Sequence, residues 1–193
     1  MSEETIRLDE KIAHVVVDFD RAGHLAGQHL ISLGHRKIGA IVGEGLEGAQ
    51  SLRLAGFKKA LGEAGLLLAE KNTKFVDDSV EGGYQAANGL VSQGSELTAL
   101  FATNDLLAFD AAQALHDRQL KIPQDFSLVS ITDIQLAQQM RPQLTTVAIH
   151  TEEIARLSVN LLLDLIANPT LQPAVVAAPE PTLIVRSSTC ALA

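Results

Sequence analysis

An apolar run ends on two polar residues in the stretch Leu97-Thr98-Ala99-Leu100-Phe101-Ala102-Thr103-Asn104-Asp105. The same arrangement recurs further along, in Phe126-Ser127-Leu128-Val129-Ser130-Ile131-Thr132-Asp133. Each polar pair stands where a buried strand would end and a helix or loop would begin. In open parallel α/β sheets, small molecules bind at the carboxyl ends of the strands. The two stretches therefore predict a binding cleft and indicate no particular reaction.

Strand-like and helix-like segments alternate on both sides of these stretches. Strands are expected at 13–17, 38–42, 73–76, 97–103, 126–131, 145–149, 174–177 and 182–185. Helices are expected at 22–33, 50–64, 80–93, 105–118 and 151–167. Repeated β-α units with short connections predict a parallel sheet with helices on both faces. The expected fold class is therefore α/β, with a doubly wound parallel sheet.

Capping residues mark the expected ends of several helices. Asp20, Ser79 and Thr151 stand at helix starts, where a side-chain oxygen can accept a hydrogen bond from a free backbone N–H. Gly34 and Gly94 follow helices, in the position that favours a left-handed residue. The apolar face expected for the last helix consists of Ile154, Leu157, Leu161, Leu162 and Leu165.

The composition is that of an acidic, aliphatic chain that can bury a core. Of its 193 residues, 47% are hydrophobic, and the mean hydropathy is +0.17. The net charge of −8 disfavours direct binding to nucleic acid, because phosphates repel an acidic surface. The single cysteine, Cys190, excludes an internal disulfide, and neither a secretion signal nor an apolar run of membrane length is recognised. We therefore expect a soluble cytoplasmic protein that does not bind membranes.

The sequence offers no convincing catalytic or metal constellation. The letters Gly43-Glu44-Gly45-Leu46-Glu47-Gly48 match a dinucleotide-binding turn, but two glutamates inside it would repel a pyrophosphate. A flexible loop is the favoured interpretation of this segment. The six histidines are scattered without metal-ligand spacing, and no Gly-x-Ser-x-Gly turn is present. We therefore expect a protein that is not an enzyme and has no catalytic residues, metal or cofactor.

The motifs, taken in order, resemble the LacI/GalR family of bacterial transcription regulators. The resemblance runs from about His14 to Thr189. It is carried by Leu25-Ala26, Leu33-Gly34-His35-Arg36, Arg53-Leu54-Ala55-Gly56-Phe57, Gly82-Gly83-Tyr84, Ala102-Thr103-Asn104-Asp105, Ile122-Pro123, Arg141-Pro142, Leu144-Thr145-Thr146 and Val185-Arg186-Ser187-Ser188-Thr189. The order of these motifs, more than any single one, makes the resemblance specific.

The resemblance implies a two-lobed core of the periplasmic-binding-protein-like type I, of which this chain is mainly the C-terminal lobe. Residues 1–17 would be a lead-in from the N-terminal lobe, and 18–148 the C-terminal lobe. Residues 149–178 would belong to the N-terminal lobe, and 179–193 would return to the C-terminal lobe. The helix-turn-helix DNA reader and most of the first lobe would then be absent from this chain. The net negative charge of the chain agrees with this, because a DNA reader is basic.

The resemblance also implies a site and a mechanism. A sugar or related effector would contact Arg53, Asn104 and the turn at Thr132 and Asp133. The family commonly has two aspartates at this turn, and Thr132 replaces the first, which removes one charged acceptor. The effector would shift the population of lobe arrangements and so change how the DNA reader binds its operator. A homodimer is implied, with the helix after Asn104 and the stretch 134–140 near its surface.

Two other functions are compatible with the expected fold. A solute-binding protein of a sugar import system would share it but would need a secretion signal. The Arg141-Pro142 motif and the ending Arg186-Ser187-Ser188-Thr189 favour the repressor over that alternative. An enzyme on a doubly wound sheet would require the loop at 43–48 to hold phosphate, which its two glutamates oppose.

Overall fold

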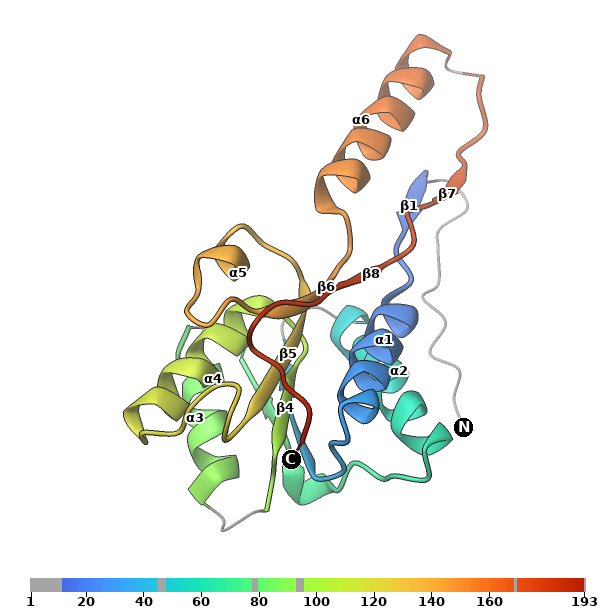
Figure 1. Ribbon diagram of the computed structural model, residues 1–193. Helices are drawn as coiled ribbons and strands as arrows, with labels where there is room; N and C mark the ends of the chain where they lie inside the picture. Colours follow the sequence, from blue (N-terminus) through green and yellow to red (C-terminus); the bar gives the residue numbers. More distant parts are fainter. Residues whose placement is uncertain (1–11, 45–47, 78–79, 93–95, 169, 193) are drawn as a thin grey trace.

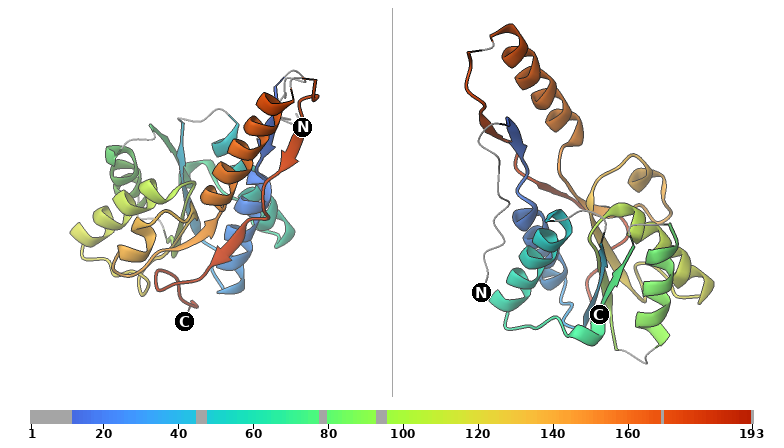
Figure 2. Two further views of the ribbon diagram at one scale, coloured as in Figure 1. Left: turned by 90° about the horizontal axis from the view of Figure 1, so that it is seen from above. Right: turned by 180° about the vertical axis from the view of Figure 1, so that it is seen from behind.

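The computed structural model describes residues 12–44, 48–77, 80–92, 96–168 and 170–192 (Figure 1). A six-stranded sheet with helices on both faces forms the body of the molecule. A small two-stranded sheet and one long helix project from this body (Figures 1 and 2). The predicted cap at Ser79, the predicted helix stop at Gly94, the tip of the 43–48 loop and the first part of the 1–17 segment lie outside the described residues.

The sheet confirms the expected α/β class. Its strands are β2 (Ile38–Gly43), β3 (Thr73–Val76), β4 (Ala99–Ala102), β5 (Ser127–Thr132), β6 (Thr145–Ala148) and β8 (Thr182–Ile184). The order across the sheet is β3-β2-β4-β5-β6-β8, with every pair parallel except β6 and β8. β2, β4 and β6 are buried along their whole length, as expected for strands covered on both faces. The remaining strands, β1 (His14–Val16) and β7 (Val175–Ala177), pair in parallel as the separate small sheet.

Four of the helices divide between the two faces of the sheet. The helices are α1 (Phe19–Ser32), α2 (Ala49–Glu63), α3 (Val80–Ser92), α4 (Asp105–Asp117), α5 (Leu136–Gln139) and α6 (Thr151–Ala167), with a 3-10 turn at Glu70–Asn72. α1 and α2 pack on one face, where the rings of Phe57 and Phe101 stack with centroids 4.1 Å apart. α3 and α4 pack on the other, around Leu100 and Leu128 (Figure 1). Successive residues of a strand therefore pack into two different cores, one on each face, because side chains alternate across a sheet.

Two predicted caps are wrong, although the predicted helix stop at Gly34 is confirmed. Asp18, not Asp20, caps α1, because the helix begins at Phe19 and the Asp18 side chain accepts from the Arg21 N–H at 2.8 Å. Thr151 is the first helical residue of α6 and not its cap. The cap position belongs to His150, whose φ of 56° serves the turn out of β6 and whose side chain makes no capping bond. Gly34, with φ of 90°, follows α1 as predicted.

The predicted apolar face of α6 is only partly covered by the rest of the described chain, since Ile154, Leu157, Leu161 and Leu165 are half-buried and Leu162 is exposed. No residue of α6 is buried, and Val159, Leu162, Leu163 and Ile166 are each more than half exposed. In Figures 1 and 2 the helix extends away from the sheet, beside β1 and β7. Within the described residues, no helix is both long and apolar enough to span a membrane.

The C-terminal residues return to the body and form hydrogen bonds with β5 and with the end of α1. His35 is buried, with Nδ1 2.9 Å from Thr98 Oγ1 and Nε2 2.9 Å from Ser127 Oγ. Its Nε2 also lies 3.1 Å from the Cys190 carbonyl oxygen. Burial lowers the pKa of His35 below its ordinary value. This histidine therefore has a structural role.

Candidate functional site

The carboxyl ends of the parallel strands form one rim of the sheet. β2, β4, β5 and β6 are neighbours in this order, and they end at Gly43, Ala102, Thr132 and Ala148. Because the strands run in the same direction, the residues that follow them gather along the same edge. The predicted pairs after β4 and β5 therefore lie at the ends of adjacent strands.

Arg53 reaches this rim from α2. It is only 4% exposed, and its Nη1 donates to the Thr103 carbonyl oxygen at 2.8 Å. Its guanidinium carbon lies 4.7 Å from the centroid of the Phe19 ring, which is a cation–π distance. The side chain thus joins the second turn of α2 to the end of β4 and the start of α1. It is therefore not a solvated side chain on the surface of the helix.

Asn104 caps α4, directly after Thr103. Its Oδ1 accepts from the Leu107 N–H at 2.9 Å. This confirms the capping role that its position predicts. The contact of Arg53 with Thr103 brings the guanidinium to the residue next to Asn104 in the chain. Two of the four predicted site residues are therefore neighbours at the end of β4.

Asp105 belongs to the first polar pair, but the sequence did not indicate its role at the site. Its buried carboxylate accepts from Ser130 Oγ at 2.5 Å, from Thr146 Oγ1 at 2.7 Å and from the Ile134 N–H at 2.8 Å. Acidic residues are common in the first turn of a helix, so the sequence offered no signal beyond capping. The structure shows instead that Asp105 ties the start of α4 to β5, to β6 and to the turn that carries the second predicted pair.

Thr132 and Asp133 form that turn in an unusual backbone conformation. Their φ values are 142° and 61°, in a region that side-chain-bearing residues rarely adopt. Asp133 Oδ1 accepts from Arg186 Nη2 at 2.6 Å, and both side chains are largely buried. Non-glycine residues in such conformations cluster at binding and catalytic sites, where the surrounding structure holds them. Here the hydrogen bond of Ile134 to Asp105 and the ion pair with Arg186 provide that support.

The structure brings the four predicted residues to one rim but not into one cavity. Thr132 and Asp133 line a polar cavity of about 720 Å³ together with Gln138, His150 and Glu152. Arg53 and Asn104 are not among its lining residues. Within the described ranges, no group of three or more His, Cys, Asp or Glu side chains is placed to hold a metal ion.

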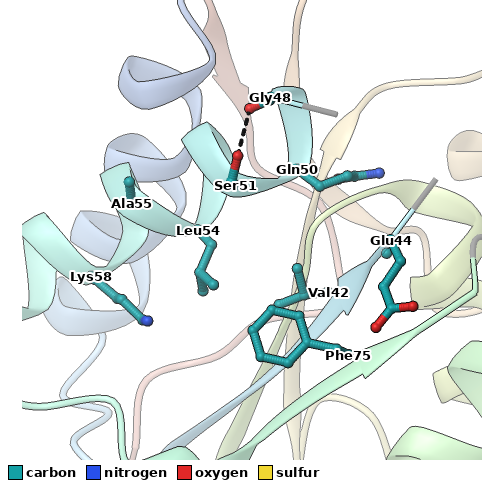
Figure 3. A pocket seen from close by; sticks show the side chains of 10 residues that line it. Val42, Glu44, Gly48, Gln50, Ser51, Leu54, Ala55, Lys58 and Phe75 are labelled. Carbon is teal, nitrogen blue, oxygen red and sulfur yellow. Dashed lines mark hydrogen bonds between the residues drawn. The ribbon is translucent and has the colours of Figure 1, made fainter. Parts of the chain in front are cut away.

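A separate groove of about 470 Å³ lies between α2 and the edge strand β3 (Figure 3). Leu54 and the ring of Phe75 face each other across it, and the charged ends of Lys58 and Glu44 lie at its rim. None of the four predicted site residues lines this groove. It is therefore distinct from the candidate site at the strand ends.

Comparison with known proteins places this geometry in a family. Residues 27–189 match the periplasmic binding protein-like domain. The ribose operon repressor of Haemophilus influenzae is 38% identical over 169 residues, which cover 86% of this chain and 50% of that protein. The chain spans about half the length of the curated relatives it matches.

Solved structures agree with this match. A LacI family transcriptional regulator from Enterococcus faecium, with bound ribose, superposes with a TM-score of 0.88 at 32% identity, over 97% of this chain and 69% of that one. The regulator CelR in complex with cellobiose has a TM-score of 0.86 at 31% identity, over 94% and 55% of the two chains. These neighbours are regulators and not components of an import system. The chain therefore belongs to the periplasmic binding protein-like domain family, as an effector-binding core of the kind found in LacI-family transcriptional regulators.

Proposed function

We propose that this chain binds a sugar or sugar derivative and that this binding controls a transcriptional repressor. The observation that supports the proposal most directly is the gathering of Arg53, Asn104 and Asp133 at adjacent strand ends of one sheet. Open α/β sheets bind ligands at this edge. The relatives named for ribose and cellobiose point to the same ligand class. The proposed role is binding and not catalysis, and it needs no metal or cofactor.

The contacts follow from the chemistry of each side chain. Arg53 is held by Phe19 and by the Thr103 carbonyl, and its guanidinium is a planar fork of donors whose chemistry suits effector hydroxyls. Asn104 carries both an acceptor and two donors on one amide. Asp133 is an acceptor whose charge is balanced by Arg186, and Thr132 adds a neutral hydroxyl. A neutral polyhydroxylated effector fits this mixture better than a cation.

The projecting elements belong, in this proposal, to a second lobe. The body comprises residues 18–148 and 179–193, whereas 1–17 and 149–178 form parts of the N-terminal lobe. The separate sheet of β1 and β7 and the exposed apolar face of α6 support this division. An exposed apolar face on this scale is typical of a surface that another segment covers. The effector would then sit between the two lobes and shift their relative arrangement.

Regulation requires partners that are proposed from the family relationship. A helix-turn-helix reader outside these residues would contact operator DNA, and a cytoplasmic homodimer would match the two-fold symmetry of operators. Leu106 of α4 and Leu136 of α5 are about half exposed on neighbouring elements. They give the proposed dimer surface an apolar centre. Phe109 and Met140 on the same elements are instead partly buried in the core of the body.

The proposed function is tested by replacing Arg53 and measuring sugar binding. We expect titration calorimetry to detect D-ribose or cellobiose binding to the wild-type two-lobed core that contains this chain. Arg53→Ala should weaken that binding by more than about tenfold, because charge-assisted hydrogen bonds each contribute roughly 1.5–3 kcal/mol. Lys58→Ala, an exposed position on the same helix, is the matched control and should bind like the wild type. Equal affinity of Arg53→Ala and wild type would remove Arg53 from the site, and a wild type that binds neither sugar contradicts the proposed ligand class.

A further inference from the structure

Arg186 stands at a junction between the candidate site and the strand that returns from the projecting elements. It follows β8 by two residues, and β8 carries the chain back from β7 to the main sheet. Its Nη2 donates to Asp133 Oδ1 at 2.6 Å, and its Nη1 donates to the Leu144 carbonyl oxygen at 2.8 Å. Its backbone N–H donates to Thr145 Oγ1 at 2.9 Å. One residue thus contacts the turn after β5 and the start of β6.

The ion pair is buried enough to constrain both partners. The Arg186 and Asp133 side chains are 11% and 19% exposed. Removing one member of such a pair leaves the other charge without compensation, which is costly at a site with little water. The planar fork of the guanidinium reaches two acceptors at once, which a lysine cannot do in the same geometry. Arg186 therefore fixes the orientation of the Asp133 carboxylate as well as its charge.

The two carboxylate oxygens of Asp133 have different surroundings. Oδ1 is occupied by Arg186, whereas Oδ2 makes no hydrogen bond within the described part of the chain. Asp133 also lines the polar cavity of about 720 Å³. With Oδ1 held from one side, Oδ2 is the acceptor that remains for a ligand hydroxyl. The left-handed backbone of Asp133, with φ of 61°, depends on contacts of this kind to persist.

We propose, building on the proposed function, that Arg186 is a positioning residue: it holds Asp133 so that Oδ2 accepts from an effector hydroxyl, and it links this contact to β8. β8 continues from the crossover at 178–181, where the chain passes between the projecting elements and the body. The ion pair thereby connects effector binding at Asp133 to β8. In this proposal β8 moves when the projecting elements and the body change their relative arrangement. Coupling of this kind needs a physical contact between the site and the moving element, and the ion pair supplies it.

A double-mutant cycle on D-ribose affinity tests the positioning role. Titration calorimetry compares the wild type, Arg186→Gln, Asp133→Asn and the double variant. We expect each single substitution to weaken binding about tenfold, and the double variant to bind within about twofold of Asp133→Asn, because Arg186 acts through Asp133. Losses that multiply in the double variant overturn the proposal. So does an Arg186→Gln variant that loses stability in urea while its ribose affinity stays unchanged, since that is the signature of a merely structural role.

Arg186→Lys keeps the test decisive if Arg186→Gln does not fold. Lysine retains a positive charge for Asp133 but loses the second contact to the Leu144 carbonyl oxygen. We expect a loss of affinity of about threefold to tenfold that disappears in the Asp133→Asn background. Ser187→Ala, at the exposed neighbouring position, is the matched control and should bind like the wild type. Wild-type affinity in Arg186→Lys overturns the proposal.

Amide hydrogen exchange tests the link to β8 without any effector. We expect Asp133→Asn to increase the exchange rate of the β8 amides and of the Arg186 N–H, because the ion pair anchors the end of this strand. Asp125→Asn, whose carboxylate accepts from the Lys121 N–H on a distant loop, should leave β8 unchanged. Unaltered β8 exchange in Asp133→Asn overturns the link. A wild type that binds neither D-ribose nor cellobiose refutes the proposed function, and the exchange result then decides the link by itself.

Discussion

Among single residues, Asp110 on α4 carries a stability cost that depends on pH. Its Oδ2 is shielded from solvent and has no hydrogen-bond partner within the described residues. Burial raises the pKa of Asp110 from 3.8 to about 6. The unfolded chain therefore loses this proton at lower pH than the folded chain does. Stability falls as the pH rises between the two values, and the full cost is present above about pH 6.

Asp110→Asn should remove this cost. We expect the variant to be more stable than the wild type by about 1 kcal/mol at pH 7, a value reduced for the solvent that reaches part of the residue. The difference should shrink toward zero at pH values below about 4, where the wild-type carboxyl is neutral in both states. Urea unfolding across this pH range measures it. Asp164→Asn, at an exposed position of α6, is the control, and a difference for Asp110→Asn that does not vary with pH contradicts the assignment.

At the scale of elements, the contact between α1 and α2 depends on glycines that let the two backbones meet. A Cβ at Gly56 would lie 1.8 Å from the Asp20 carbonyl oxygen, and one at Gly23 would lie 1.9 Å from the Arg53 carbonyl oxygen. Neither oxygen can move without shifting a helix. The same contact sets the distance between Phe19 at the start of α1 and Arg53 on α2. The packing of two helices therefore positions a residue of the candidate site.

Gly56→Ala and Gly62→Ala, on the same helix, separate packing from helix propensity. We expect Gly56→Ala to lower the free energy of unfolding by about 2–3 kcal/mol through overpacking. A Cβ at Gly62 would meet nothing within 4 Å, so Gly62→Ala should raise stability by about 0.5 kcal/mol. Urea unfolding followed by circular dichroism distinguishes the two. Equal effects of the two substitutions would mean that the helices do not meet at Gly56.

At the scale of the whole molecule, α6 contributes an apolar surface that the body does not use. Leu162 is 57% exposed, whereas Leu107 of α4 is fully buried. We expect Leu162→Lys to change the free energy of unfolding of this chain by less than about 0.5 kcal/mol, as for other exposed positions. Leu107→Ala, the buried control, should cost about 3 kcal/mol. Binding of a hydrophobic dye should also decrease in Leu162→Lys. A loss of stability close to that of the buried control would show that α6 packs against the chain after all.

Local patterns specified most of the elements and the edge of the sheet at which the site lies. Apolar runs of strand length and helical spacing of apolar residues placed β2, β4, β5, α1, α2 and α4 close to their observed bounds. The polar pairs after β4 and β5 were enough to predict a cleft at the carboxyl edge. Helix starts were predicted less well, because Asp18 and Asp20 are equally plausible caps until the contacts of the first turn are known.

The sequence alone determined the α/β class and the position of Asn104, Thr132 and Asp133 directly after strands, since these follow from periodicity and residue order. Only the tertiary structure decided that Arg53 leaves solvent to contact Thr103, that Asp105 joins three elements and that Arg186 pairs with Asp133. The physical reason is distance along the chain: the partners of these side chains are separated by 25 to 53 residues and meet only when the strands assemble. Local propensity contains no information about such contacts, because their energy arises from burial and hydrogen bonding between elements.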